Sequence, residues 1–87
     1  MRMIRFTALW CPSCLFMRPR WDKVFAAYPD VPILTYDFDE CPEEVAHWKI
    51  GPILPVLILE EDGKEITRLT GEKSIKELTR WAEGWLR

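Results

Sequence analysis

Hydrophobic and polar residues follow two different periods along this chain, and together they predict four strands and three helices. Short apolar runs bounded by Pro, Gly or Asp are typical of strands, whereas apolar residues spaced three or four apart indicate helices. The predicted strands are Met3–Leu9, Val31–Phe38, Val56–Glu60 and Glu65–Leu69. The predicted helices are Leu15–Tyr28, with a first turn that opens at Pro12, then Pro42–Lys49, and a last helix that starts near Ser74. The resulting order, βαβαββα, belongs to the α/β class.

Turn and capping residues separate these elements. Pro29-Asp30 ends the first helix, and Ile50-Gly51-Pro52 ends the second. Glu61-Asp62-Gly63-Lys64 is typical of a hairpin turn between the last two strands. Ser74 and Glu77 predict a capping box at the start of the last helix. The apolar face of that helix is predicted to hold Ile75, Leu78, Ala82 and Trp85, and Trp81 and Trp85 are interpreted as core or packing residues.

The length and composition of the chain limit its function. With 87 residues, of which 48% are hydrophobic and five are Trp, the chain can form one modest, aromatic-rich core, so we expect a single domain over residues 1–87. Twelve basic and 14 acidic residues are interspersed and sum to a net charge of −2, which favours neither nucleic acid nor an anionic membrane as a partner. The first residues include Arg2 and Arg5 but no long apolar stretch typical of a signal peptide, and no run is long enough to span a bilayer. We therefore expect a cytoplasmic monomer.

The segment with the most chemistry is Trp10-Cys11-Pro12-Ser13-Cys14, where the first apolar run ends and the first helical pattern begins. Two thiols separated by two residues on one helical turn can form a disulfide with little backbone movement. Pro12 suits an early helical position, where its missing N–H costs nothing. Cys11 then lies at the helix N-terminus, where unpaired N–H groups and the helix dipole favour its thiolate, and Cys14 lies deeper. In a reducing compartment, this pattern predicts a catalytic or metal-binding pair rather than a structural disulfide.

Three features of the chain resemble the thioredoxin superfamily. They are the Trp10–Cys14 segment that opens a helix, Pro19 five residues after Cys14, and Leu54-Pro55-Val56 before a strand. The resemblance covers nearly the whole chain. It implies a three-layer α/β/α fold with a four-stranded mixed sheet, and a cis peptide bond at Leu54-Pro55 in a loop that faces the cysteines.

The resemblance also implies a thiol–disulfide oxidoreductase, and the expected cytoplasmic location favours net reduction of protein disulfides. Cys11 would attack the substrate disulfide, and Cys14 would resolve the mixed disulfide that forms. No bound cofactor is expected, because the electrons reside in the cysteines. The implied partners are disulfide-containing proteins and a thioredoxin reductase-like or other thiol reductant. The implied substrate-binding residues are Trp10, Pro12, Ser13, Leu54 and Pro55.

The chain departs from the superfamily pattern in ways that bear on its chemistry. Arg5 stands where thioredoxins carry a buried acid, and Thr35 aligns with the basic partner of that acid, so proton transfer to and from Cys14 would need water or another group. The chain is glutaredoxin-sized, but Thr70-Gly71-Glu72-Lys73 argues against a dedicated glutathione site. The loop Gly51–Pro55 is one residue longer than the usual thioredoxin loop. The Pro12-Ser13 dipeptide leaves reductase, oxidase and isomerase open.

Two other classes of function compete with this hypothesis. Cys11 and Cys14 could bind zinc together with Cys41 or His47, since three thiols and an imidazole form a ligand set that zinc accepts. Against zinc, Cys41 and His47 belong to a separate helix and no second C-x-x-C exists. Alternatively, the fold could dock a partner with its thiols incidental. Cys41 is interpreted as a helix-start residue in a solvated turn, with a regulatory or dimerising thiol as the alternative, and His47 as a surface residue.

Overall fold

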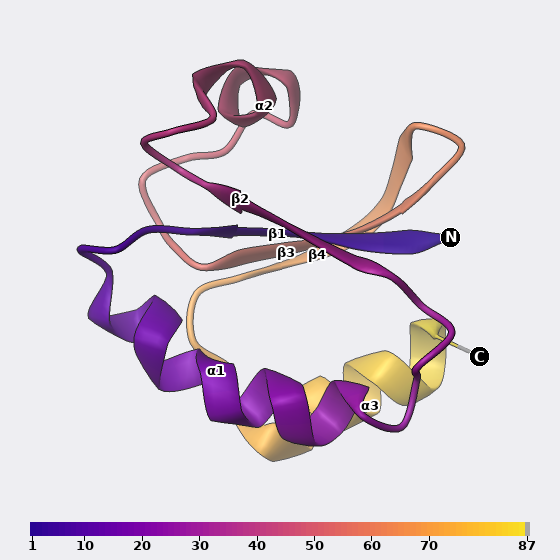
Figure 1. The fold of residues 1–87 in the computed structure, drawn as a ribbon. Coiled ribbons are helices and arrows are strands. Elements are labelled where there is room, and N and C mark those ends of the chain that lie inside the picture. Colours follow the sequence, from indigo (N-terminus) through magenta and orange to yellow (C-terminus); the bar gives the residue numbers. More distant parts are fainter. Residues whose placement is uncertain (87) are drawn as a thin grey trace.

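The computed structural model describes residues 1–86, which contain the predicted elements in the predicted order (Figure 1). The strands are β1 (Arg2–Thr7), β2 (Ile33–Asp37), β3 (Val56–Glu61) and β4 (Lys64–Thr70). The helices are α1 (Pro12–Phe25), α2 (Pro42–His47) and α3 (Ile75–Trp85). The sheet order is β2-β1-β3-β4, with β1 and β2 parallel and the other pairs antiparallel. The predicted four-stranded mixed sheet is confirmed.

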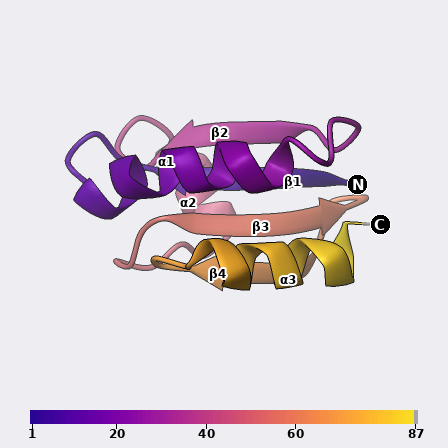
Figure 2. The same ribbon diagram turned by 90° about the horizontal axis from the view of Figure 1, so that it is seen from below.

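The three helices cover the two faces of this sheet. Helix α2 lies alone on one face, and α1 and α3 lie side by side on the other (Figure 1). In the view from below, α1 lies in front of β1 and β2, and α3 lies in front of β4 and beside β3 (Figure 2). The arrangement is the expected three-layer α/β/α fold. Within residues 1–86, no helix is long and apolar enough to cross a membrane.

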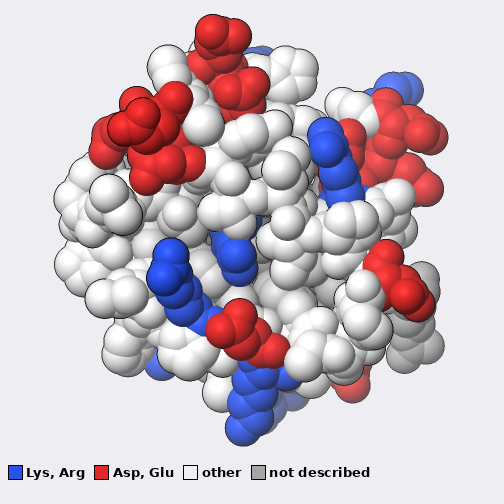
Figure 3. All heavy atoms as spheres, viewed as in Figure 1, with Lys and Arg blue, Asp and Glu red and all other residues white. Residues whose placement is uncertain are grey.

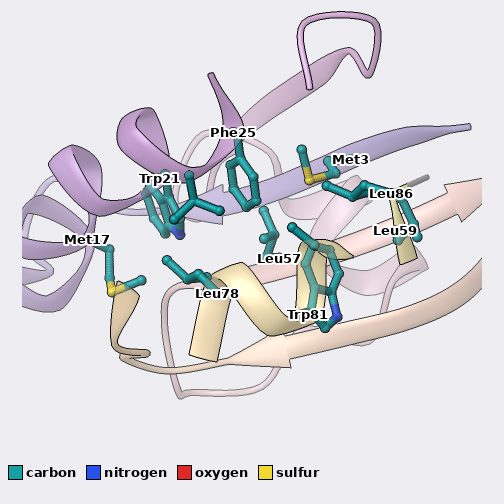
Figure 4. Packing of buried hydrophobic residues seen from close by; sticks show 11 residues of the cluster. Met3, Met17, Trp21, Phe25, Leu57, Leu59, Leu78, Trp81 and Leu86 are labelled. Carbon is teal, nitrogen blue, oxygen red and sulfur yellow. The ribbon is translucent and has the colours of Figure 1, made fainter. Parts of the chain in front are cut away.

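Alternation along the strands divides the core into two clusters, because neighbouring strand residues point to opposite faces. Met3 and Leu59 face α1 and α3, whereas Ile4 and Phe6 face α2. The cluster between the sheet and the helices α1 and α3 (Figure 4) consists of Met3, Met17, Trp21, Val24, Phe25, Leu57, Leu59, Leu78, Trp81, Ala82 and Leu86. The cluster on the α2 side consists of Ile4, Phe6, Ala8, Cys11, Cys14, Leu54, Val56 and Ile58. Both cysteines of the C-x-x-C segment are therefore part of the core.

The first strand is shorter than predicted. It ends at Thr7 rather than Leu9, because the chain turns away from the sheet and the Cys11 amide donates to the Ala8 carbonyl at 3.2 Å. Leu9 is consequently 97% exposed and Trp10 is 59% exposed. The prediction that the strand reaches Leu9 was wrong, and the difference places two large apolar side chains on the surface beside Cys11.

The ends of two helices and of strand β2 also differ from those predicted from the sequence. Helix α1 ends at Phe25 rather than Tyr28, since the amide of Tyr28 bonds to Phe25 at 2.9 Å in the tighter i to i−3 pattern. Helix α2 ends at His47 because Lys49 has a φ of 53°, in the left-handed region that terminates a helix. Strand β2 is likewise shorter, beginning at Ile33.

The last helix and the hairpin before it follow the predicted local chemistry. The Ser74 hydroxyl accepts from the Glu77 amide at 3.1 Å, and the Ser74 amide donates to Glu77 Oε1 at 3.3 Å, which confirms the capping box. Asp62 and Gly63 both have positive φ, as a two-residue hairpin turn requires.

The buried face of α3 is narrower than predicted. Leu78 and Ala82 are buried as expected, but Ile75 and Trp85 are exposed, so the prediction was wrong for those two. Trp81 is buried, as its interpretation as a core residue predicted, and it packs edge-on against Phe25 of α1. The helix therefore presents to the core the residues that meet α1 and the sheet, rather than its whole apolar stripe.

Candidate active site

Cys11 occupies the N-cap position of α1. Its backbone is extended, Pro12 follows as the first helical residue, and the Cys11 sulfur accepts a hydrogen bond from the Cys14 amide at 3.2 Å. The sulfur thus takes the place that a hydroxyl or carboxylate oxygen usually holds at an N-cap. It lies at the positive end of the helix dipole, among amides that the helix itself leaves unpaired. The predicted position of Cys11 at the helix start is confirmed.

Cys14 is the more shielded thiol, as predicted, with 4% of its surface exposed. Burial, and then a hydrogen bond to the Cys11 side chain, raise the pKa of Cys14 to about 12. Both cysteines are free thiols in this structure. At neutral pH the Cys14 thiol therefore keeps its proton, and a protonated thiol is a poor nucleophile toward a disulfide.

A pocket of about 440 Å³ opens directly over the two cysteines. Its lining residues are Thr7, Ala8, Leu9, Trp10, Cys11, Pro12, Cys14, Leu15, Arg18 and Asp37. They come from the end of β1, the connection between β1 and α1, the first turns of α1 and the end of β2. One wall is apolar, with Leu9 and Leu15 exposed, and Arg18 and Asp37 bring charged groups to the pocket.

Trp10 stands at the edge of this pocket, held by residues beyond β2. Its indole Nε1 donates to Asp39 Oδ2 at 2.6 Å, and its ring packs edge-on against Phe38. These contacts hold a half-exposed ring beside Cys11. Sequence reasoning placed Trp10 at the site but missed Asp39, whose partner lies 29 positions away.

Ser13, between the two cysteines, is joined to the loop that precedes α3. Its hydroxyl donates to Glu72 Oε2 at 2.7 Å. Pro12, Ser13, Phe16 and Glu72 together line a shallow depression next to the cysteines. Glu72 was missed as a site residue, since the sequence singled out its segment only as a poor match to a glutathione site.

The Leu54-Pro55 bond is cis, as the resemblance implied. Both residues are buried, and Leu54 packs in the same cluster as Cys11 and Cys14. The Pro55 carbonyl accepts from the Gly71 amide at 2.8 Å, which ties this loop to the end of β4. Ile53, just before them, is the exposed apolar residue of the loop. The loop thus lies against the cysteine pair, and substrate contact by Leu54 and Pro55 stays a prediction.

Arg5 and Thr35 meet as the alignment predicted. They pair in register across β1 and β2, and the guanidinium of Arg5 donates to Thr35 Oγ1 at 3.0 and 3.2 Å. The same guanidinium lies 4.8 Å from the centre of the Trp21 ring. Burial lowers the pKa of Arg5, although Asp22 opposes the shift. At positions 5 and 35 the chain therefore has a cation and a hydroxyl, where the thioredoxin pattern has an acid and its basic partner.

The residues proposed as additional zinc ligands lie on α2. Cys41 is its N-cap residue and is half-buried, and His47 is exposed and packs edge-on against Trp48. Within residues 1–86, no group of three or more His, Cys, Asp or Glu side chains is arranged to hold a metal ion. The zinc hypothesis finds no support in this geometry.

Known proteins resemble this chain over most of its length. Mitochondrial thioredoxin-3 of Saccharomyces cerevisiae is 35% identical over 82 residues, covering 87% of this chain and 64% of the relative. The thioredoxin of Chlamydia trachomatis is 38% identical over 71 residues, covering 82% and 69%. Rice thioredoxin H2-2 is 32% identical, and the match covers 82% of this chain and 52% of the relative. The chain thus spans about half to two thirds of the length of these curated relatives.

Solved structures agree with the sequence relatives. Thioredoxin 1 of Thermosipho africanus superposes with a TM-score of 0.81 at 26% identity, covering 99% of this chain and 94% of that one. Oxidised mitochondrial thioredoxin 3 of S. cerevisiae gives 0.81 at 30% identity, covering 94% and 76%. The family model described as thioredoxin matches residues 1–84. Because this match includes the C-x-x-C segment, the cis-proline loop and nearly all of the fold, the chain belongs to the thioredoxin family.

Proposed function

We propose that this chain is a thiol–disulfide oxidoreductase that reduces protein disulfides through Cys11 and Cys14. The observation that carries the proposal is the Cys11 sulfur at the N-cap of α1, bonded to the Cys14 amide and lining a pocket. A sulfur in that position meets the positive end of the helix dipole, and a thiolate is the form that attacks disulfides. Membership of the thioredoxin family supports the same chemistry.

The two cysteines divide the reaction. The Cys11 thiolate attacks one sulfur of a substrate disulfide, the substrate S–S bond breaks, and the departing sulfur takes up a proton. Cys14 then loses its proton and attacks the Cys11 sulfur, which releases the second substrate thiol and leaves a Cys11–Cys14 disulfide. Two electrons and two protons pass to the substrate, and no bound cofactor is needed. A thioredoxin reductase-like enzyme or another thiol reductant restores the dithiol.

A protein substrate would dock on the apolar surface around the cysteines. Exposed large apolar side chains surround the pair: Leu9, Trp10, Leu15, Phe16 and Ile53. Such a patch is typical of a surface that binds another protein. Trp10, Pro12 and Ser13 would contact the substrate at the rim, and Leu54 with Pro55 would support the thiols from the loop side. We extend the proposal to a monomer that works in a reducing compartment such as the cytoplasm.

The raised pKa of Cys14 predicts which thiol reacts first. Under single-hit conditions at pH 7, iodoacetamide should label Cys11 and leave Cys14 almost unmodified, because a thiol of pKa about 12 is only roughly 10⁻⁵ thiolate at that pH. Labelling at Cys14 should rise roughly tenfold for each pH unit, since its thiolate fraction does. Peptide mapping by mass spectrometry measures both sites. Comparable labelling of the two cysteines at pH 7 would contradict the assigned order.

A redox titration tests the proposed function directly. Equilibration against a dithiothreitol or glutathione series should show one two-electron transition, followed by tryptophan fluorescence because Trp10 adjoins Cys11. The Cys41→Ser variant should titrate unchanged, whereas the Cys11→Ser variant should show no transition. A value near about −270 mV would support a reductase, and one near about −120 mV would favour an oxidase. Absence of any transition in the native chain would refute the function.

A further inference from the structure

The pocket over the cysteines carries two charged groups that the reduction of a generic protein disulfide does not use. Arg18 lies four residues after Cys14 on α1, and Asp37 lies at the end of β2, paired in register with Thr7. Both line the pocket together with Cys11 and Cys14. A guanidinium and a carboxylate thus border the space into which a disulfide must come to be attacked.

These two groups are available to a ligand. The Arg18 guanidinium makes no hydrogen bond or ion pair with residues 1–86, and it is exposed. Asp37 uses Oδ1 to accept from the amides of Asp39 and Glu40, at 2.9 and 3.1 Å, and its other carboxylate oxygen has no hydrogen-bond partner within residues 1–86. No ion pair joins Arg18 to Asp37. The pocket therefore offers a positive and a negative contact that do not neutralise each other.

Charged side chains of both signs also lie on the surface outside the pocket. On the face shown in Figure 3, acidic side chains gather mainly over α2 and the β3–β4 hairpin, and basic side chains lie near the middle, along the lower edge and beside the hairpin. The half-buried guanidinium of Arg5 lies close enough to Arg18 for the two positive charges to repel each other. A second cation therefore lies near Arg18. The volume of about 440 Å³ lies within the range of small-molecule pockets, about 300–1000 Å³.

We propose that this pocket binds the cysteine half of an amino-acid disulfide, with its carboxylate at Arg18 and its ammonium at Asp37. The inference rests on the proposed function, because it supplies a substrate for the same two thiols. The half could come from free cystine or from a cysteine attached by a disulfide to a protein thiol. In both cases the carboxylate and the ammonium of the cysteine half lie close to its disulfide. Arg18 and Asp37 likewise line the same pocket as Cys11 and Cys14.

The reaction with cystine balances without a further reagent. The Cys11 thiolate attacks one cystine sulfur, the cystine S–S bond breaks, and one cysteine leaves and takes a proton. Attack by Cys14 on the mixed disulfide then releases the second cysteine with the second proton. The chain is oxidised to the Cys11–Cys14 disulfide, and cystine is reduced to two cysteines.

Four small disulfides separate the two charges in one experiment. Cystine carries both, 3,3′-dithiodipropionate carries only carboxylates, cystamine carries only ammonium groups, and bis(2-hydroxyethyl) disulfide carries neither. The second-order rate constant for oxidation of the reduced chain is measured with each disulfide. Because the leaving thiols differ in acidity, every rate is divided by that for the neutral disulfide and compared between variant and native chain.

Arg18→Gln should lower the relative rates for cystine and 3,3′-dithiodipropionate by about 1.5- to 5-fold, the range that one exposed ion pair supplies. Asp37→Asn should lower those for cystine and cystamine similarly, and its Oδ1 can still accept from the two amides. Arg18→Lys should keep most of the preference. Lys64→Gln, in the hairpin at the far end of the sheet, removes an equal charge and should leave all ratios unchanged (Figure 1). Salt should reduce the native preference.

A peptide whose single cysteine carries a disulfide-linked cysteine separates the two sources. If the Arg18 and Asp37 effects appear with both the peptide and free cystine, the pocket binds the cysteine half alone, and if they appear with free cystine only, the site is restricted to small disulfides. Equal ratios in native and variant chains would overturn the inference while leaving the thiol chemistry intact. Failure of all the disulfides, including the neutral one, to oxidise the chain would refute the proposed function as well.

Discussion

The Cys11→Ser variant should lose turnover down to the rate of buffer alone, whereas Cys14→Ser should complete the first attack and then stop. The reason is the geometry of the pair. Only Cys11 combines the N-cap position with the opening of the pocket, and a serine hydroxyl there is far less acidic than a thiol. In the proposed reaction Cys14, shielded and protonated, acts only on the mixed disulfide, so its removal should leave that intermediate with no resolving thiol.

The measurement is a non-reducing gel with mass spectrometry after each variant meets a disulfide-containing protein such as insulin. Cys14→Ser should accumulate one covalent adduct per chain, which dithiothreitol releases, and Cys11→Ser should accumulate none. Cys41→Ser serves as the control, because Cys41 caps a separate helix and should leave turnover unchanged. Equal amounts of trapped adduct in the Cys11→Ser and Cys14→Ser variants would contradict the assigned roles.

A second large effect is expected on stability, from Leu59→Ala in β3. Leu59 has no exposed surface and packs between the sheet and the helix pair (Figure 4). Its truncation removes buried apolar surface and leaves a cavity that the surrounding helices close only in part. The free energy of unfolding should fall by about 2–5 kcal/mol. Because domains of this size are only marginally stable, that is a large fraction of the total.

Leu9→Ala provides the matched control, since the chemical change is identical. Leu9 is 97% exposed and outside the strand, so the free energy of unfolding should change by no more than about 0.5 kcal/mol. Urea denaturation followed by tryptophan fluorescence measures both variants. Similar losses in the two variants would mean that the burial pattern of β1 and β3 is misassigned.

Periodicity and punctuation in the sequence were enough to predict the fold. Strand and helix order follow from local patterns, so the type and order of every element were predicted and confirmed. Element ends were less well predicted, because they depend on where the backbone can leave the sheet, as at Thr7, or enter the left-handed region, as at Lys49. The buried face of α3 was assigned partly wrongly: Trp81 is buried in contact with α1 as predicted, whereas Ile75 and Trp85 are exposed, because they lie beyond that contact.

For the site, the sequence by itself determined the C-x-x-C pair, its place at a helix start and the loop that carries the cis bond, because each of these features is a local motif of a few residues. Only the tertiary structure decided what surrounds the pair. The contacts of Trp10 with Asp39 and of Ser13 with Glu72 join residues 29 and 59 positions apart, and Arg18 and Asp37 come to one pocket from a helix and a strand. Contacts of this kind leave no period or spacing along the chain, since they depend on how the packed layers bring distant side chains together.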